Sequence, residues 1–186
     1  MQTQSLDGGF HNAPIEAAYA FRAVMRAMAC PGTIVTLAGA EPPAPLSRAA
    51  GVVVLTLCDP ETPVYLAPSR NTAAIRDWIT FHTGAPLVAA DRAAFGLGLW
   101  SELGQGGFPL GTAEYPDRSA TLIVELPQLA AAGATLQGPG IETSAELSLP
   151  EIAAFQANAR LFPRGLDYLF TCGDRLAGLP RTTKVR

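Results

Sequence analysis

The chain has 186 residues, of which 48% are hydrophobic and 16% charged, a composition that predicts one folded domain over residues 1–186 and excludes a disordered chain. Its formal net charge of −3 at pH 7 gives no electrostatic indication of binding to nucleic acid or to a lipid surface. The longest apolar run, residues 51–57, is too short to span a bilayer, and the N-terminal sequence MQTQSLDGGF does not resemble an export signal, so we expect a cytoplasmic protein.

The first predicted element is a helix that begins after Asn12 and reaches about Ala29. Asn12 is a suitable N-cap, and Pro14 falls in the first turn, where a missing N–H breaks no helical hydrogen bond. Apolar side chains then recur at steps of three and four, a spacing that predicts one apolar stripe. The residues of this predicted stripe are Ala18, Phe21, Met25 and Met28.

The middle of the chain is predicted to alternate strands with a second helix. The predicted strands are 33–37, 63–67 and 95–100. The apolar run at 45–57 fits either a buried strand or a buried helix, because periodicity does not separate the two in so short a segment. A helix is predicted from about Asn71 to the glycine at position 84, a residue typical of helix C-termini. Its stripe consists of Ile75, Ile79 and His82.

The C-terminal third is predicted to contain a strand, a helix and a second strand. In residues 119–126 alternate positions are apolar with a period of two, which predicts a strand. Ser148 and Glu151 stand in capping-box register, so we expect a helix from Ser148 that breaks at 162–163. Residues 165–186 are expected to begin as a strand and to end as a basic tail. Strands and helices mixed along the whole length predict an α/β or α+β domain built in layers.

The sequence LQGPGIE, residues 136–142, raises the question of a phosphate-binding loop. A Walker loop requires a lysine after its last glycine, because the amine neutralises phosphate charge. Here Ile141 and Glu142 follow Gly140, and the third glycine of a dinucleotide fingerprint would fall on Thr143. We therefore interpret this motif as a tight turn.

Two places are candidates for polar chemistry. In YPDRS, Asp117, Arg118 and Ser119 converge where a turn meets a strand, a position at which binding groups often lie. A charged hairpin end is the alternative reading, and no G-x-S-x-G motif indicates a serine nucleophile. His82 lies at a predicted helix C-terminus, whose dipole favours a cation. The absence of an identifiable partner acid favours the alternative, a core or capping histidine.

Basic residues form two further groups. Arg22 and Arg26 lie four residues apart, and like charges at this spacing repel, so an acidic partner or an anionic ligand would relieve them. A solvated face is the alternative. Near the C-terminus Arg181, Lys184 and Arg186 lie close to hydroxyl groups and fit a phosphate, an acidic surface or a frayed end.

Reactive side chains are few. The chain has three cysteines, and none belongs to a C-x-x-C pair. We interpret them as small buried apolar residues, and with only His11 and His82 besides we expect no metal site. Lys184 is the only lysine among 13 basic residues, so a Schiff base would have to form there. The cysteines are Cys30, Cys58 and Cys172.

Taken together, seven motifs in order resemble the PhnH family, a subunit of the bacterial carbon–phosphorus lyase system. The similarity extends from about Phe10 to Lys184. The motifs are FRAVMRAMACPG (21–32), LTLCDPETPVYL (55–66), FHTGAPL (81–87), GTAEYPDRSATLI (111–123), LQGPGIE (136–142), FPRGLDYLF (162–170) and LPRTT (179–183).

The resemblance implies a three-layer α/β domain with a mixed sheet flanked by helices, similar to the large domain of pyridoxal-phosphate-dependent transferases. It also implies that the isolated subunit pairs with itself and that it works in a core complex with PhnG, PhnI and PhnJ. That complex converts an alkylphosphonate and ATP to α-D-ribose 1-methylphosphonate 5-triphosphate and adenine. The nucleosidase-like chemistry is assigned to PhnI, and the role of PhnH is not defined.

From these implications we expect a structural or substrate-holding subunit that is not catalytic alone. Lys184 lies in the terminal tail, so we expect the pyridoxal cofactor to be lost although the fold is kept. If a phosphonate or a nucleotide binds, its anion-binding residues are predicted to be Arg118, Ser119, His82 and Arg164. Two alternatives stay open: a stand-alone small-molecule transferase that uses YPDRS and His82, and a free anion-binding module.

Overall fold

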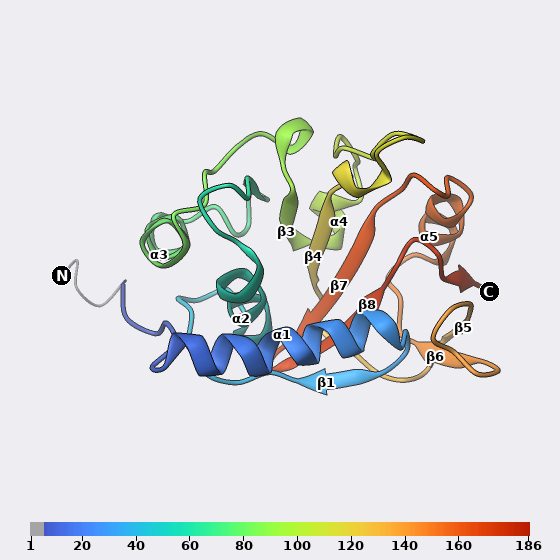
Figure 1. Cartoon of the computed structure of the whole chain (residues 1–186), viewed down its shortest axis with the longest axis horizontal. Coiled ribbons are helices and arrows are strands. Elements are labelled where there is room, and N and C mark those ends of the chain that lie inside the picture. Colours follow the sequence, from blue (N-terminus) through green and yellow to red (C-terminus); the bar gives the residue numbers. More distant parts are fainter. Residues whose placement is uncertain (1–5) are drawn as a thin grey trace.

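The computed structural model of the protein describes residues 6–186 and is built around a mixed sheet (Figure 1). The six strands of this sheet lie in the order β1-β8-β7-β4-β3-β2. Strands β2, β3, β4 and β7 are mutually parallel, whereas β8 and β1 run antiparallel to their neighbours. Their bounds are β1 Ile34–Thr36, β2 Val64–Leu66, β3 Phe95–Leu99, β4 Thr121–Glu125, β7 Asp167–Cys172 and β8 Arg175–Leu179. The prediction of an α/β fold with a mixed sheet and helices is confirmed.

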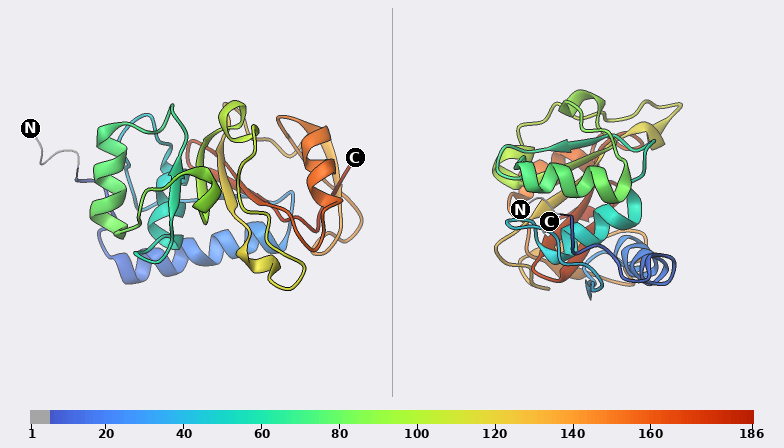
Figure 2. Two further views of the ribbon diagram at one scale, coloured as in Figure 1. Left: turned by 90° about the horizontal axis from the view of Figure 1, so that it is seen from above. Right: turned by 90° about the vertical axis from the view of Figure 1, so that its left-hand side faces the viewer.

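Helices and a small second sheet cover the two faces of the large sheet. Buried residues of the first three helices pack on one face, and those of α5 pack on the other together with the three-stranded sheet β6-β5-β9. Figure 2 shows α5 far from α2 and α3. The helices are α1 Ala13–Ala29, α2 Arg48–Leu57, α3 Ala73–Thr83, α4 Trp100–Leu103 and α5 Ile152–Ala159, with 3-10 turns η2 Ala90–Arg92 and η3 Pro116–Arg118. The small sheet consists of β5 Ala134–Gln137, β6 Ala145–Leu147 and β9 Lys184–Val185.

Strand β4 lies at the centre of the large sheet and is buried on both faces. Ile123 contributes to the core under the helices, whereas Leu122 and Val124 contribute to the core on the opposite face. The neighbouring strand β7 divides in the same way, with Leu169 on the helical side. The period of two in the sequence therefore predicts the strand correctly, but the side chains on both faces of the strand are packed in a core.

Of the apolar stripe predicted for the first helix, only Met28 packs against the core. Phe21 and Met25 are exposed, and the buried residues of α1 are Ala20, Val24 and Ala27. The reason is close packing on β8, where a Cβ at Gly178 would lie 2.8 Å from the carbonyl oxygen of Ala27. Because the helix approaches the sheet so closely, the small side chain of Ala27 and the flexible one of Met28 lie over Gly178, whereas Phe21 and Met25 lie outside.

Three further segments differ from the prediction. The run at 45–57 forms helix α2, capped by Ser47, whose Oγ accepts a hydrogen bond from the N–H of Ala50 at 3.2 Å. Helix α5 begins at Ile152 rather than at Ser148, because the Ser148 hydroxyl instead accepts a hydrogen bond from the N–H of Ala130. The C-terminal segment is not a frayed tail. It forms a β7–β8 hairpin and then β9, which pairs with β5.

The LQGPGIE sequence forms a tight turn after β5, as predicted. Gly140 has a φ of 80°, and a Cβ there would lie 1.8 Å from the carbonyl oxygen of Ala29 at the end of α1. The turn thus packs the small sheet against the helix rather than leaving a loop open for phosphate. Between residues 6 and 186, no helix combines the length and the apolar character that a bilayer crossing requires.

Candidate functional site

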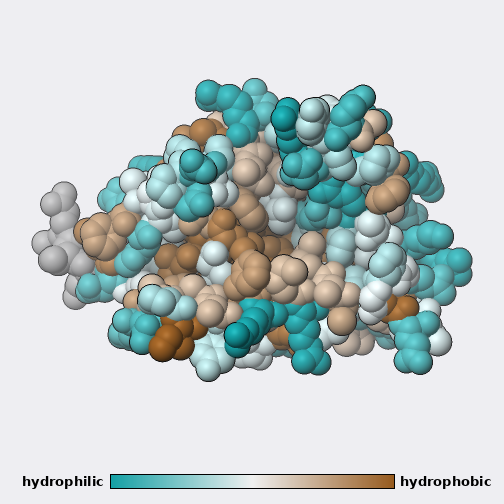
Figure 3. All heavy atoms as spheres, in the orientation of Figure 1, coloured by the Kyte–Doolittle hydropathy of each residue, from teal (hydrophilic) through white to brown (hydrophobic). Residues whose placement is uncertain are grey.

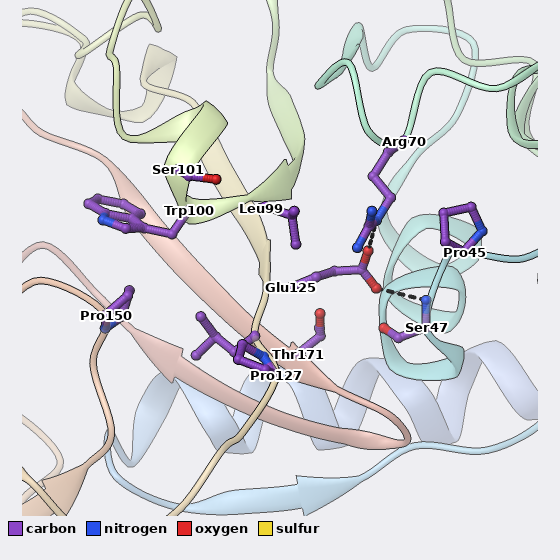
Figure 4. A pocket seen from close by; sticks show the side chains of 11 residues that line it. Pro45, Ser47, Arg70, Leu99, Trp100, Ser101, Glu125, Pro127, Pro150 and Thr171 are labelled. Atoms are coloured by element: carbon purple, nitrogen blue, oxygen red, sulfur yellow. Dashed lines mark hydrogen bonds and ion pairs between the residues drawn. The ribbon is translucent and has the colours of Figure 1, made fainter.

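A cleft of about 550 Å³ lies at the carboxyl ends of the parallel strands (Figure 4). Leu99, Glu125 and Thr171 contribute from β3, β4 and β7, and they are paired in register across the sheet. Ser47, at the start of α2, and Arg70, in the loop after β2, complete one wall. Open α/β sheets bind ligands at this edge, so we call the hollow the carboxyl-edge cleft and take it as the first candidate site.

An ion pair between Arg70 and Glu125 forms one side of the carboxyl-edge cleft. The Arg70 Nε donates to one carboxylate oxygen of Glu125, and the backbone N–H of Ser47 donates to the other at 2.7 Å (Figure 4). The side chains of Arg70 and Glu125 are only 11% and 6% exposed. Glu125 therefore links the end of β4 to the start of α2 and to the loop after β2.

A second carboxylate, Glu102 on α4, lies beside this pair. It accepts hydrogen bonds from the backbone N–H of Ser69, at 2.8 Å, and from the Ser69 hydroxyl. Burial opposes ionisation of Glu102, but these bonds, a longer one from the N–H of Leu99 and the nearby charge of Arg70 together lower its pKa below the ordinary value. The loop after β2 is therefore tied to α4 by a charged group.

The opposite wall of the cleft is aromatic. The Trp100 ring packs 4.8 Å from the ring of Phe155, and its Nε1 donates to Glu151 at 3.1 Å. Three carboxylates, those of Glu102, Glu125 and Glu151, thus lie around the cleft or touch its wall, against one guanidinium that is already paired. An additional anion is disfavoured there by charge repulsion, so the cleft suits a neutral or cationic group better.

The carboxyl-edge cleft also does not fit a Schiff-base cofactor. Lys184 lies on β9, exposed, at the edge of the small sheet, and its backbone is paired in register with Gln137. It is not among the residues that line the cleft. No group of three side chains suited to a metal ion occurs among residues 6–186.

Most of the residues predicted to bind an anion lie at the other edge of the sheet, at the amino ends of β4 and β7. Arg181 organises this region: its Nη1 lies 2.7 Å from the carbonyl oxygen of Pro116 and 3.5 Å from that of Pro163, and its Nη2 donates to the Ser119 hydroxyl. The same guanidinium forms an ion pair with Asp167 at the start of β7. Arg181 therefore joins the 3-10 turn η3 to the loop before β7.

This arrangement brings Arg118 and Arg164 to the same edge, with Ser119 between η3 and β4. We call Arg118, Ser119, Arg164 and Arg181 the amino-edge cluster. The Arg118 guanidinium lies 4.0 Å from the centre of the Tyr115 ring, and both Arg118 and Arg164 are exposed. Among the described residues neither of them forms an ion pair. The cluster thus offers two guanidinium groups that are accessible from solvent.

His82 lies apart from this cluster, at the end of α3 (Figure 1). Its Nε2 is 2.8 Å from the carbonyl oxygen of Leu6, and its ring makes edge contacts with Trp78 and Phe81. His82 therefore joins the N-terminal segment to α3. The structure brings together three of the four predicted anion-binding residues and places the fourth elsewhere.

The expectation that all three cysteines are buried is correct only for Cys58. Burial, with a smaller contribution from the charge of Asp59, raises the pKa of the Cys58 thiol to about 12. Cys30 and Cys172 are half-buried. All three are free thiols.

No motif in the sequence predicts the carboxyl-edge cleft. The available signal was positional: Glu125 lies near the end of a predicted strand after three buried residues, and Arg70 follows a predicted strand by three residues. Charged residues directly after buried parallel strands lie at the edge where α/β proteins bind ligands. The direction and order of the strands, which decide this, are not visible in the sequence.

Comparison with known proteins identifies the family. A sequence model described as "PhnH: Bacterial phosphonate metabolism protein (PhnH)" matches residues 8–186. The chain is 41% identical over 194 residues to the alpha-D-ribose 1-methylphosphonate 5-triphosphate synthase subunit PhnH of Rhizobium meliloti (strain 1021), covering 99% of this chain and 97% of the relative. It is 28% identical over 195 residues to the putative C-P lyase subunit protein HtxG of Stutzerimonas stutzeri, covering 95% and 94%. The chain therefore belongs to the PhnH family.

Proposed function

We propose that this protein is a subunit of the carbon–phosphorus lyase core complex, in which PhnG, PhnI and PhnJ are its partners. The complex would convert an alkylphosphonate and ATP to α-D-ribose 1-methylphosphonate 5-triphosphate and adenine, in the cytoplasm. The observation that carries the proposal is the match over nearly the full length to a relative named as a subunit of that synthase. The second relative, named as a putative C-P lyase subunit, supports the same assignment.

Within the complex, the chain acts as a structural or substrate-holding subunit and is not catalytic alone. This proposal is supported by the charged groups in and beside the carboxyl-edge cleft, which already have partners within the chain: Arg70 pairs with Glu125, and Glu102 accepts hydrogen bonds from Ser69. Groups held in this way stabilise loops rather than activate a nucleophile. The single domain over residues 1–186, the pairing of isolated subunits and the relationship to pyridoxal-phosphate transferases stay predictions.

Co-purification tests the proposal. The tagged protein, expressed from its own promoter in phosphate-starved cells, is expected to bring down PhnG, PhnI and PhnJ in fixed ratios. A deletion strain that carries the gene on a plasmid is expected to regain growth on methylphosphonate as the phosphorus source. If no sister subunit is captured and growth does not depend on the gene, the proposal fails. Turnover of methylphosphonate with ATP by the purified single chain would instead support the stand-alone transferase.

The amino-edge cluster supports a second role, the holding of an anionic group of a phosphonate or a nucleotide. Arg118 and Arg164 are exposed and, among the described residues, form no ion pair, and guanidinium groups bind phosphate oxygens through paired hydrogen bonds. The structure gives His82 no place in this cluster.

Calorimetry with ATP and with methylphosphonate tests this role. In Arg118→Ala and Arg164→Ala the affinity should fall about tenfold or more, because each removes a charged hydrogen-bond donor. The matched control is Arg92→Ala, an exposed arginine on η2 away from the cluster. Equal affinity in all three variants, or no heat with the unmodified protein, would refute anion binding here.

A further inference from the structure

The outer face of α1 carries large apolar side chains in contact with solvent. Tyr19 and Met25 are 67% and 52% exposed, and Ile15 is exposed one turn before Tyr19. These three residues, together with Arg22 and Arg26, are called the outer face of α1. Figure 3 shows apolar and charged residues side by side along the lower front, where Figure 1 places α1. Tyrosine, methionine and arginine are the residue types enriched where proteins bind proteins.

The charge of this face is entirely positive. The Arg22 guanidinium lies 5.9 Å from the centre of the Tyr19 ring, and neither Arg22 nor Arg26 forms an ion pair with any described residue. The only acidic residue of α1 is Glu16, which accepts a hydrogen bond from the N–H of Asn12 at 2.8 Å. The whole chain has a net charge of −3, so this local excess of positive charge is not a general property of its surface. Carboxylates on a partner would neutralise it.

A groove beside Tyr19 provides a place for an apolar side chain of a partner. It has a volume of about 270 Å³ and lies between α1 and the segment that follows β1. Glu16, Tyr19, Ala20 and Ala23 form one side, and Thr36, Leu37, Ala38 and Gly39 form the other. The alanines and the glycine leave the groove open, and Glu16 is its only charged lining residue.

Helix α1 is held rigidly behind this face. On one side Ala27 packs directly over Gly178 of β8, and at the C-terminal end the Ala29 carbonyl lies against Gly140. A face fixed in this way loses little conformational entropy when a partner binds.

We infer that the outer face of α1 is the surface with which this chain docks onto a different protein of the carbon–phosphorus lyase complex, one whose contact surface is apolar and carries carboxylates opposite Arg22 and Arg26. The inference rests on the proposed function. A second copy of the chain does not fit this face. Two-fold pairing on it would place Arg22, at its centre, against the same residue of the other copy, while the acidic residue of α1, Glu16, lies in the first turn and is engaged with the N–H of Asn12.

The test is capture of PhnG, PhnI and PhnJ by tagged R22E/R26E, with the complex expressed in full. Reversal of both charges is expected to lower the amount of captured subunits at least tenfold, because attraction becomes repulsion across the contact. The control R92E/R160E makes the same change in total charge at two exposed arginines on η2 and after α5. It is expected to capture as much as the unmodified chain.

A second variant tests the apolar part of the surface. Y19A removes an exposed ring without changing charge, and a loss of about tenfold in captured subunits is expected if this ring is a centre of the contact. Circular dichroism and thermal melting of all variants should match those of the unmodified chain, because the changed side chains are exposed.

The outcomes separate the two proposals. If the unmodified chain captures no sister subunit, the proposed function fails. If it captures them and R22E/R26E captures the same amount, only the docking surface is refuted. An equal loss in R92E/R160E would point to net charge and would also refute it. The docking surface is also refuted if R22E/R26E captures the sister subunits normally but, as an isolated chain, self-associates differently in sedimentation velocity. The face would then bind a second copy.

Discussion

Replacement of Glu125 by alanine should destabilise the protein far more than its single carboxylate suggests. The substitution leaves the Arg70 guanidinium and the N–H of Ser47 without their acceptors. Both side chains of the ion pair are almost fully buried, at 11% and 6% exposure, so water does not replace the lost contacts.

The size of the effect follows from burial. Removal of one partner from a buried ion pair costs about 3–5 kcal/mol, since the remaining charge is left in a poorly solvated place. For a chain of 186 residues this corresponds to a fall in melting temperature of about 6–20 °C. The ion pair of Glu41 with Arg48 is the matched control, because its side chains are 71% and 41% exposed. Glu41→Ala should cost about 0–1 kcal/mol.

Urea unfolding followed by far-ultraviolet circular dichroism, with tryptophan fluorescence as a second probe, measures both changes. The double variant Arg70→Met with Glu125→Leu removes both charges and should be more stable than Glu125→Ala alone, because no unpaired charge remains buried. If Glu125→Ala loses no more stability than Glu41→Ala, or if the double variant is the least stable of the three, the ion pair does not hold the cleft as described.

Three further changes test other parts of the structure. Ser69→Ala should raise the pKa of Glu102 toward its ordinary value. A lowered pKa of Glu102 stabilises the folded protein at pH values above the unfolded pKa of 4.5, and this stabilisation is lost as the pH falls through the folded pKa. The difference in unfolding free energy between the variant and the unmodified protein should therefore be present at neutral pH and vanish in acid. The Cys58 thiol should react with a disulfide reagent at pH 8 only after denaturation, whereas the other two thiols react earlier. Gly178→Val should cost about 1–3 kcal/mol in thermal or urea unfolding, because its side chain would meet the Met28 sulfur and force α1 outward.

Local signals in the sequence predicted the position of most elements but not which side of them is buried. In α1 the predicted apolar stripe divides, since Phe21 and Met25 face outward and Met28 packs against the core. The decisive residue, Gly178, lies about 150 residues later in the chain and acts by allowing close approach. Periodicity reports which residues share a face, and only the neighbouring element decides whether that face is covered.

The prediction of helix starts and of short strands was limited for a similar reason, because contacts distant in the sequence decide them. Ser148 and Glu151 satisfy the spacing of a capping box, yet the hydroxyl of Ser148 bonds to Ala130, eighteen residues earlier, and the helix begins later. The β7–β8 hairpin and the pairing of β9 with β5 were missed, because a short strand at a chain end has too few residues for an alternation to appear.

The two candidate sites differ in how far the sequence predicts them. Arg118, Ser119 and Arg164 were predicted from motifs. Arg181 joins the segments that carry them, because it contacts Ser119 and the carbonyl groups of Pro116 and Pro163. The carboxyl-edge cleft is assembled from residues at the ends of three strands, in the loop after a fourth strand and at the start of one helix. Its existence depends on strand order, which no single motif contains.

The two edges of the sheet differ in what they offer an anion. At the carboxyl edge, where α/β proteins commonly bind phosphate at a helix N-terminus, the backbone N–H of Ser47, the N-cap of α2, already donates to the carboxylate of Glu125. The protein thus supplies its own anion at this position. An anionic substrate is accordingly expected at the amino edge, where Arg118 and Arg164 are exposed. Glu125→Gln should therefore leave the affinity for ATP unchanged while Arg118→Ala lowers it, and the reverse pattern in calorimetry would place the anion in the carboxyl-edge cleft.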